Sequence, residues 1–154
     1  MSDPSDLSVI PDRVKWSERL LVGVPEIDAQ HKELYRRIDR FLRALSARKG
    51  KSEVLPLMAY LDDYIREHFA AEQQMMELSE YAGLGDHMAE HHFFEEEYRR
   101  LCARLDGEGA TPALARELVA LLVDWLDRHL ESTDRAFGAH LSRHRARLSR
   151  RPSA

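Results

Sequence analysis

Residues 86–101 read DHMAEHHFFEEEYRRL, and one helical face of this stretch would carry His87, His91, Phe94, Tyr98 and Leu101. These positions alternate in steps of four and three residues, the spacing that keeps side chains on one face of an α-helix. Glycines before and after the stretch are typical of helix boundaries. The sequence therefore predicts a helix over about residues 86–106, with two histidines on its buried face.

The same rhythm of apolar residues occurs three more times along the chain. It predicts helices over about residues 26–48, over about 52–78, and from Pro112 to at least Glu131. The first is expected to stop near Lys49 and Gly50, Ser52 is expected to cap the second, and Thr111 to cap the last. Short connections between four such helices predict an all-α fold, an antiparallel up-down-up-down four-helix bundle.

The chain of 154 residues is long enough for one domain with a good core. We expect an extended N-terminal arm at residues 1–15, the bundle at 16–141 and a basic C-terminal tail at 142–154. The tail carries most of its charge on Arg143, Arg145, Arg147, Arg150 and Arg151. It is interpreted as a solvated helical extension, although its charge could also attract an anionic partner.

Composition argues against several classes of protein. A net charge of −4 gives no reason to expect nucleic acid as a partner, and no apolar stretch approaches the roughly 20 residues that span a bilayer. The N-terminus lacks the basic start and apolar run of a secretory signal. A single cysteine, Cys102, excludes an intramolecular disulfide, and we expect a cytoplasmic protein.

Six polar residues occupy positions on the predicted inward faces where apolar residues would be expected. They come from all four helices and are His31, His68, Glu72, His87, His91 and His129. A lone histidine at such a position is usually a hydrogen-bonded core residue. Burying several unpaired polar groups would cost about 1–3 kcal/mol each, a large share of a domain's stability of about 5–15 kcal/mol. The set therefore indicates a metal site.

The spacing and chemistry of these residues narrow the kind of site. His68 and Glu72 are four residues apart, as are His87 and His91, so each pair can chelate from one helical face. Nitrogen and carboxylate ligands without thiolate suit iron, manganese, zinc or copper. A mononuclear zinc site is the alternative, but it needs only four ligands. The larger set favours two ions bridged by the carboxylate.

Four short motifs occur in order: DAQH at 28–31, HFAAE at 68–72, HMAEH at 87–91 and HLESTD at 129–134. This set resembles the signature of the hemerythrins, in particular the single-domain bacterial members. The resemblance covers about residues 16–141 and implies two iron ions with an oxo or hydroxo bridge. It adds Asp134, five residues after His129 and off the helical stripe, so a helix end or a π-type widening must turn this residue inward.

The resemblance also implies how the ligands divide. His87, His91 and His129 would hold one iron, His31 and His68 the other, and Glu72 and Asp134 would bridge the two. The iron with two histidines would keep one open position for dioxygen. Apolar residues are expected to wall the oxygen pocket, namely Leu34, Phe69, Trp125, Leu126 and Leu130. Gln73 departs from many relatives, which have a second acid there, but it touches no ligand position.

These features predict reversible dioxygen binding for transport, storage or delivery, with no catalytic residue. The chain contains no Glu-x-x-His motif, which di-iron oxygenases of ferritin-like architecture use in pairs. Two alternatives stay open: a di-iron peroxidase or nitric oxide reductase, and an oxygen or redox sensor. The chain offers little outside the bundle as an output domain. An acceptor or reductase protein is the expected partner, and the oligomeric state is not predicted.

Overall fold

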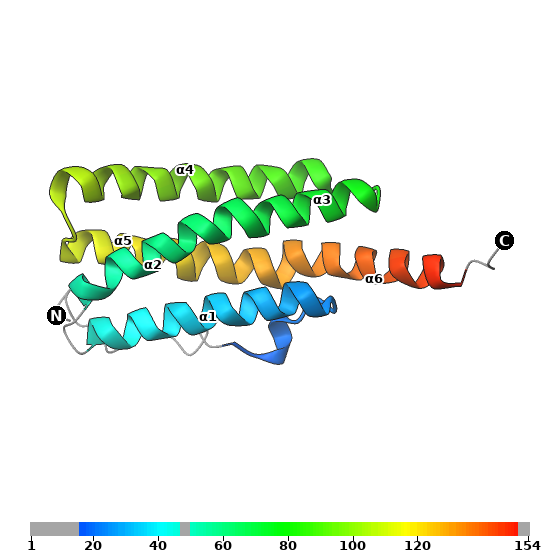
Figure 1. Ribbon diagram of the computed structural model, residues 1–154, viewed down its shortest axis with the longest axis horizontal. Coiled ribbons are helices and arrows are strands. Elements are labelled where there is room, and N and C mark those ends of the chain that lie inside the picture. The colour runs from blue at the N-terminus through cyan, green and yellow to red at the C-terminus, as the bar shows by residue number, and fades with distance from the viewer. Residues whose placement is uncertain (1–15, 47–49, 151–154) are drawn as a thin grey trace.

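Four helical rods lie antiparallel in the computed structural model, which describes residues 16–46 and 50–150 (Figure 1). A 3₁₀ turn, η2 (Glu18–Leu20), precedes the first rod, α1 (Pro25–Ser46). The second rod is continuous but changes its winding, running through α2 (Gly50–Tyr64), the π-helical η3 (Ile65–Phe69) and α3 (Ala70–Leu78).

The third rod is the unbroken helix α4 (Leu84–Glu108). The fourth consists of α5 (Pro112–Leu121), the π-helical segments η4 (Leu122–Leu126) and η5 (His129–Asp134), and α6 (Arg135–Ser149). Each rod runs opposite to the one before it, and the described residues contain no β-strand. The predicted all-α, up-down-up-down four-helix bundle is confirmed.

Helix boundaries agree with the sequence signals at some ends and not at others. Thr111 caps α5 as predicted, because its Oγ1 accepts a hydrogen bond from the backbone N–H of Leu114 at 3.1 Å. The boundary between the first two helices differs. Gly50 is the first residue of α2, so Ser52 lies inside the first turn and does not precede it. The predicted N-terminal arm and Lys49 lie outside the described residues.

Two apolar clusters fill the bundle, one after the other along its axis. The larger contains Leu34, Phe94 and Leu130, and the smaller contains Ile27 and Phe137 together with Met76. On α1, Ile27 belongs to the smaller cluster and Leu34 to the larger, and the predicted ligand His31 lies between them. The predicted ligands of the other rods also lie between residues of the two clusters. The polar positions therefore form a layer between two apolar layers.

A short segment before α1 closes the end of the smaller cluster. Val22 is buried there, and its backbone N–H donates to Asp28 Oδ1 at 2.8 Å. The segment can approach α6 because residue 138 is glycine. A Cβ atom at Gly138 would collide with the carbonyl oxygen of Val22, so only glycine permits this contact.

The last rod projects beyond the other three at its C-terminal end (Figure 1). The basic segment that begins at residue 142 is therefore helical as far as Ser149, as a continuation of α6. Arg145 in this segment donates to Glu26 Oε1 at 2.6 Å, which ties it to the start of α1. Residues 151–154 lie outside the described part. Among the described helices, none is both long and apolar enough to cross a bilayer.

Candidate metal centre

Three π-helical segments occur in the described residues, and two of them contain predicted ligands. η3 includes His68, and η5 begins at His129 and ends at Asp134. A π turn takes one more residue than an α turn, so residues five apart come onto the same face. The widening predicted for the HLESTD motif is therefore present. It turns Asp134 into the bundle, where its exposed fraction is 2%.

All seven predicted ligands lie in one buried layer. Their exposed fractions are no more than 3%, and the residues are His31, His68, Glu72, His87, His91, His129 and Asp134. The structure brings them into two overlapping groups whose ligand atoms could hold metal ions. One group contains His87, His91 and His129 with both carboxylates, and the other contains His31 and His68 with Glu72.

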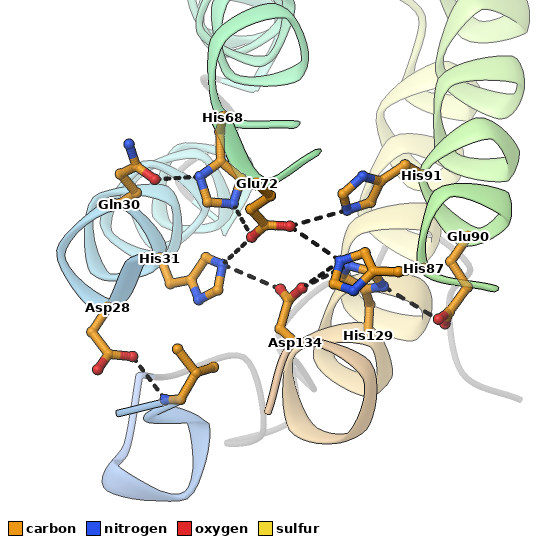
Figure 2. A network of polar contacts seen from close by, with 11 residues as sticks. Asp28, Gln30, His31, His68, Glu72, His87, Glu90, His91, His129 and Asp134 are labelled. Atoms are coloured by element: carbon orange, nitrogen blue, oxygen red, sulfur yellow. Dashed lines mark hydrogen bonds and ion pairs between the residues drawn. The ribbon is translucent and has the colours of Figure 1, made fainter. Parts of the chain in front are cut away.

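Figure 2 shows the two carboxylates between the two groups of histidines. Glu72 directs Oε1 to Nε2 of His68 at 2.7 Å, and it directs Oε2 to Nε2 of His87 at 3.1 Å and of His91 at 3.3 Å. Each oxygen of Glu72 therefore faces a different group. This is the arrangement that a carboxylate needs in order to bridge two cations.

Asp134 has the same two-sided arrangement. Its Oδ2 lies 3.2 Å from Nε2 of His31, and its Oδ1 lies 3.0 Å from Nε2 of both His87 and His129. Asp134 therefore contacts both groups, His31 in the second and His87 and His129 in the first. Each of the two carboxylates directs one oxygen to each group, so each group has two carboxylate oxygens beside its imidazoles.

The charges of this layer are coupled through short distances and burial. Burial lowers the pKa of His31, but the carboxylates of Asp134 and Glu72 outweigh it and raise the pKa to about 9. The same causes raise the pKa of His87 to about 9. Burial also lowers the pKa of His129, yet the charge of Asp134 raises it to about 9. The metal-free centre therefore holds protons on these imidazoles.

The pKa values of His91, Glu72 and Asp134 are all lowered, but for different reasons. Burial lowers the pKa of His91, and this effect prevails over the attraction of Glu72. Burial would raise the pKa values of Glu72 and Asp134, but the surrounding histidines hold both well below their usual range. Both carboxylates are therefore ionised and available as anionic ligands.

The hydrogen bonding of the layer tests whether metal fits it. Several of these close contacts have ion-pair distances without the geometry of a hydrogen bond. Within the described residues, no hydrogen-bond partner is found for Nε2 of His31, His91 and His129, for Oε1 of Glu72 or for Oδ1 of Asp134. Buried polar atoms are normally paired, because an unpaired one costs about 1–3 kcal/mol. Metal ions would satisfy these atoms, and the nitrogen and oxygen donors suit iron. The residues present therefore fit a metal centre.

Two outer contacts orient individual histidines (Figure 2). Gln30 Oε1 lies at hydrogen-bonding distance from Nδ1 of His68. Because this oxygen can only accept, Nδ1 carries the proton and Nε2 is left for metal. Glu90 Oε1 lies 3.6 Å from Nδ1 of His129, an ion-pair distance longer than a hydrogen bond. The two groups are therefore supported differently, one by an amide and the other by a carboxylate.

Aromatic rings surround the histidines on the side of the larger cluster. Phe69 stacks on His91 with ring centroids 3.8 Å apart, and Trp125 stacks on His129 at 4.4 Å. The predicted pocket walls Leu34, Phe69, Leu126 and Leu130 are buried, and Trp125 is half-buried. The structure thus places four of the five predicted walls in the buried core and all five in or against the larger cluster.

Sequence reasoning assigned no role to several residues that shape this centre. Gln30 and Glu90 each precede a predicted ligand in the DAQH and HMAEH motifs, and this position could have indicated their role beside the centre. Tyr64, four residues before His68, stacks on the His68 ring at 4.4 Å. Gly138 gave no signal, because its role depends on a segment that is remote in sequence.

Comparisons with known proteins point to one family. Residues 22–141 match the model of the hemerythrin HHE cation binding domain. A myohemerythrin of Theromyzon tessulatum is 28% identical over 125 residues, which cover 81% of this chain and 91% of that protein. A bacteriohemerythrin of Stenotrophomonas maltophilia is 24% identical over 135 residues, covering 88% and 86%.

A bacteriohemerythrin of Methylococcus capsulatus is 27% identical over 117 residues, which cover 75% of this chain and 86% of that protein. No solved structure matches the chain at a significant level. The family model spans the whole buried layer, from before His31 to beyond Asp134. With its four antiparallel rods and its layer of imidazoles and carboxylates, this chain belongs to the hemerythrin family.

Proposed function

We propose that this protein binds dioxygen reversibly at two non-haem iron ions, as a carrier, store or delivery protein. The observation that supports it most directly is the two-sided placement of Glu72 and Asp134, each with one oxygen toward each group of histidines. A single ion would leave one side of both carboxylates without a cation. Two ions would satisfy both sides.

The seven side chains would then have distinct roles. His87, His91 and His129 would hold one iron, and His31 and His68 the other, with both carboxylates between them. When bound, the two ferrous ions would each supply one electron to dioxygen and recover it on release. Since the second group has fewer imidazoles, the open position is expected beside His31 and His68.

The wall of the expected oxygen pocket favours binding over oxygen activation. Leu34, Phe69, Trp125, Leu126 and Leu130 carry neither an acid nor a base, so they offer no proton for cleavage of the oxygen–oxygen bond. Four of the five are buried, and they would keep water and anions from the irons. The protein contribution is therefore to hold two ions in a dry, apolar setting.

The test begins with purified protein whose iron content is measured per chain. The protein is reduced without oxygen, exposed to air and then returned to an oxygen-free atmosphere. We expect two irons per chain and a visible absorption band that appears with oxygen and disappears without it. A colourless protein with one zinc ion would contradict the proposal.

The same preparation separates the alternatives. A carrier should form a stable oxygenated species and show little steady-state turnover of peroxide or nitric oxide with an electron donor. Rapid turnover would identify an enzyme. A sensor should change its affinity for a partner protein when oxygenated, whereas a carrier needs only an acceptor or a reductase.

A further inference from the structure

A groove of about 540 Å³ opens on the side of the bundle between the second and third rods. Its walls include Ile65, Phe69, Ala70 and Met88, and Gln73 also lines it. Polar side chains also line the groove: those of Arg66 and Arg99 are 68% and 77% exposed, and that of Glu95 is 23% exposed. The lining of the groove is therefore mainly apolar, and the groove opens to solvent.

The metal centre is closed in both directions along the bundle axis. The larger apolar cluster lies on one side of the ligand layer and the smaller cluster on the other. Leu34 and Ile27, the neighbours of His31 on these two sides, are each only 1% exposed. A small molecule must therefore reach the layer from the side, between two rods.

Phe69 connects the groove with the centre. It lines the groove, yet it is only 5% exposed, and its ring stacks on His91 with the two planes within 2° of parallel. Among the described residues that line the groove, it is the one that also belongs to the predicted oxygen-pocket wall. The Phe69 ring also lies beside His68 of the second group, with ring centroids 6.2 Å apart. A single aromatic ring thus separates an open groove from both groups of histidines.

We propose that this groove is the route by which dioxygen reaches the metal centre, with the Phe69 ring as its gate. This rests on the proposed function, because it names the path of the same ligand. Dioxygen is small and nonpolar, so an apolar groove admits it at little cost, whereas a charged or strongly hydrated molecule loses its hydration there. Side-chain rotation of Phe69 opens the path briefly, and the ring keeps bulk water out when it is closed.

Two adjacent glutamines provide a matched test. Gln73 lines the groove, and Gln74 is exposed on the same helix outside it. Gln73→Phe should narrow the groove and slow association and dissociation of dioxygen by one common factor. We expect about tenfold, the effect of an added barrier of about 1.4 kcal/mol. The equilibrium affinity should not change, because an obstruction raises the barrier equally in both directions.

Gln74→Phe should leave both rates at the wild-type value. Ala70→Phe, at an exposed position on the groove wall, serves as a second obstructing variant if Gln73→Phe does not fold. Rates in the obstructing variants that equal those of wild type would overturn the route. So would a change in affinity without a common change in both rates.

Xenon gives a readout that does not depend on the chemistry of iron. In crystals held under xenon pressure, we expect xenon in the groove against Phe69 in wild type and in Gln74→Phe, and none there in Gln73→Phe. If the protein forms an oxygen adduct but the groove holds no xenon and the rates are unchanged, only the route is wrong. If no adduct forms, the proposed function fails, and xenon alone decides whether the groove is an apolar gas site.

Discussion

Oδ2 of Asp134 lies 3.2 Å from Nε2 of His31, although the two residues belong to different rods of the bundle. The other oxygen, Oδ1, lies 3.0 Å from Nε2 of His129, which is in the same π-helical segment as Asp134. One carboxylate thus connects the two groups of histidines. This geometry exists because η5 is wound with one extra residue per turn.

Asp134→Asn should weaken metal binding and lower the pKa of His31 and of His129 in the metal-free protein. The amide keeps the shape of the carboxylate but removes the charge that raises both pKa values. We expect a loss of affinity beyond the roughly 10- to 100-fold typical of a lost outer contact. Metal titration and NMR titration of the histidines measure the two effects.

Asp106→Asn, an exposed position on α4, is the control for the loss of a negative charge. It should change neither quantity. If Asp134→Asn leaves iron affinity and both histidine pKa values at the wild-type level, Asp134 is not part of the centre.

Metal uptake should depend on pH in a defined direction. Metal binds neutral imidazole, and the pKa values of His31, His87 and His129 are raised from 6.5 to about 9. Affinity should therefore rise with pH between about 6.5 and about 9 and change less above that range. Uptake near neutral pH should also release protons, which calorimetry in buffers of different ionisation enthalpy can count.

The stability of the metal-free protein should fall as the pH rises over the same range. A raised pKa in the folded state means that stabilisation is complete below 6.5 and is lost as the pH rises through about 9. Chemical denaturation of the metal-free protein across this range measures it. An affinity that falls with rising pH, or a metal-free protein that gains stability there, would contradict the protonation pattern of this centre.

Gln30→Leu should weaken binding at the group that contains His68. Leucine cannot accept the proton of His68 Nδ1, so the ring loses its fixed orientation and tautomer. We expect a roughly 10- to 100-fold loss of affinity for one of the two metal ions. Gln74→Leu, at an exposed position on α3, is the matched control. Equal affinities in the two variants would mean that Gln30 does not orient the ligand.

Leu126→Ala should shorten the lifetime of the oxygenated protein. Leu126 is 3% exposed, and removing most of its side chain would let water or anions approach the irons. Leu122→Ala removes a side chain of the same size at 2% exposure, outside the predicted pocket wall. Both variants should lose about 2–5 kcal/mol of stability. Only Leu126→Ala should accelerate autoxidation, and equal decay rates in both would disprove shielding by this residue.

Gly138→Ala should destabilise the fold even though alanine favours a helix by about 1 kcal/mol over glycine. Its Cβ atom would displace the Val22 segment, which closes the smaller apolar cluster. Gly107→Ala adds the same methyl group to α4, where nothing lies within 4 Å of the new atom. We expect that variant to be neutral or up to about 1 kcal/mol more stable in denaturant unfolding. The opposite order of the two variants would show that the Val22 contact is unimportant.

The sequence by itself determined the class of fold and most of the buried layer. A helix repeats its face every three to four residues, so His31, His68, Glu72, His87, His91 and His129 could be found as polar positions on apolar faces. Thr111 could be recognised as a helix cap because capping also depends only on residues that are close in sequence. Asp134 was added only by the resemblance to the hemerythrins, and its position five residues after His129 then required the winding of η5.

The tertiary structure decided what depends on contacts between remote segments. Two-sided placement of Glu72 and Asp134 requires all four rods at once, and the hydrogen bond of Gln30 to His68 joins two of them. The contact of Val22 with Gly138 and the groove beside Phe69 arise where separate rods pack. Helical periodicity describes one face of one helix, and it carries no information on the distance between side chains of different helices.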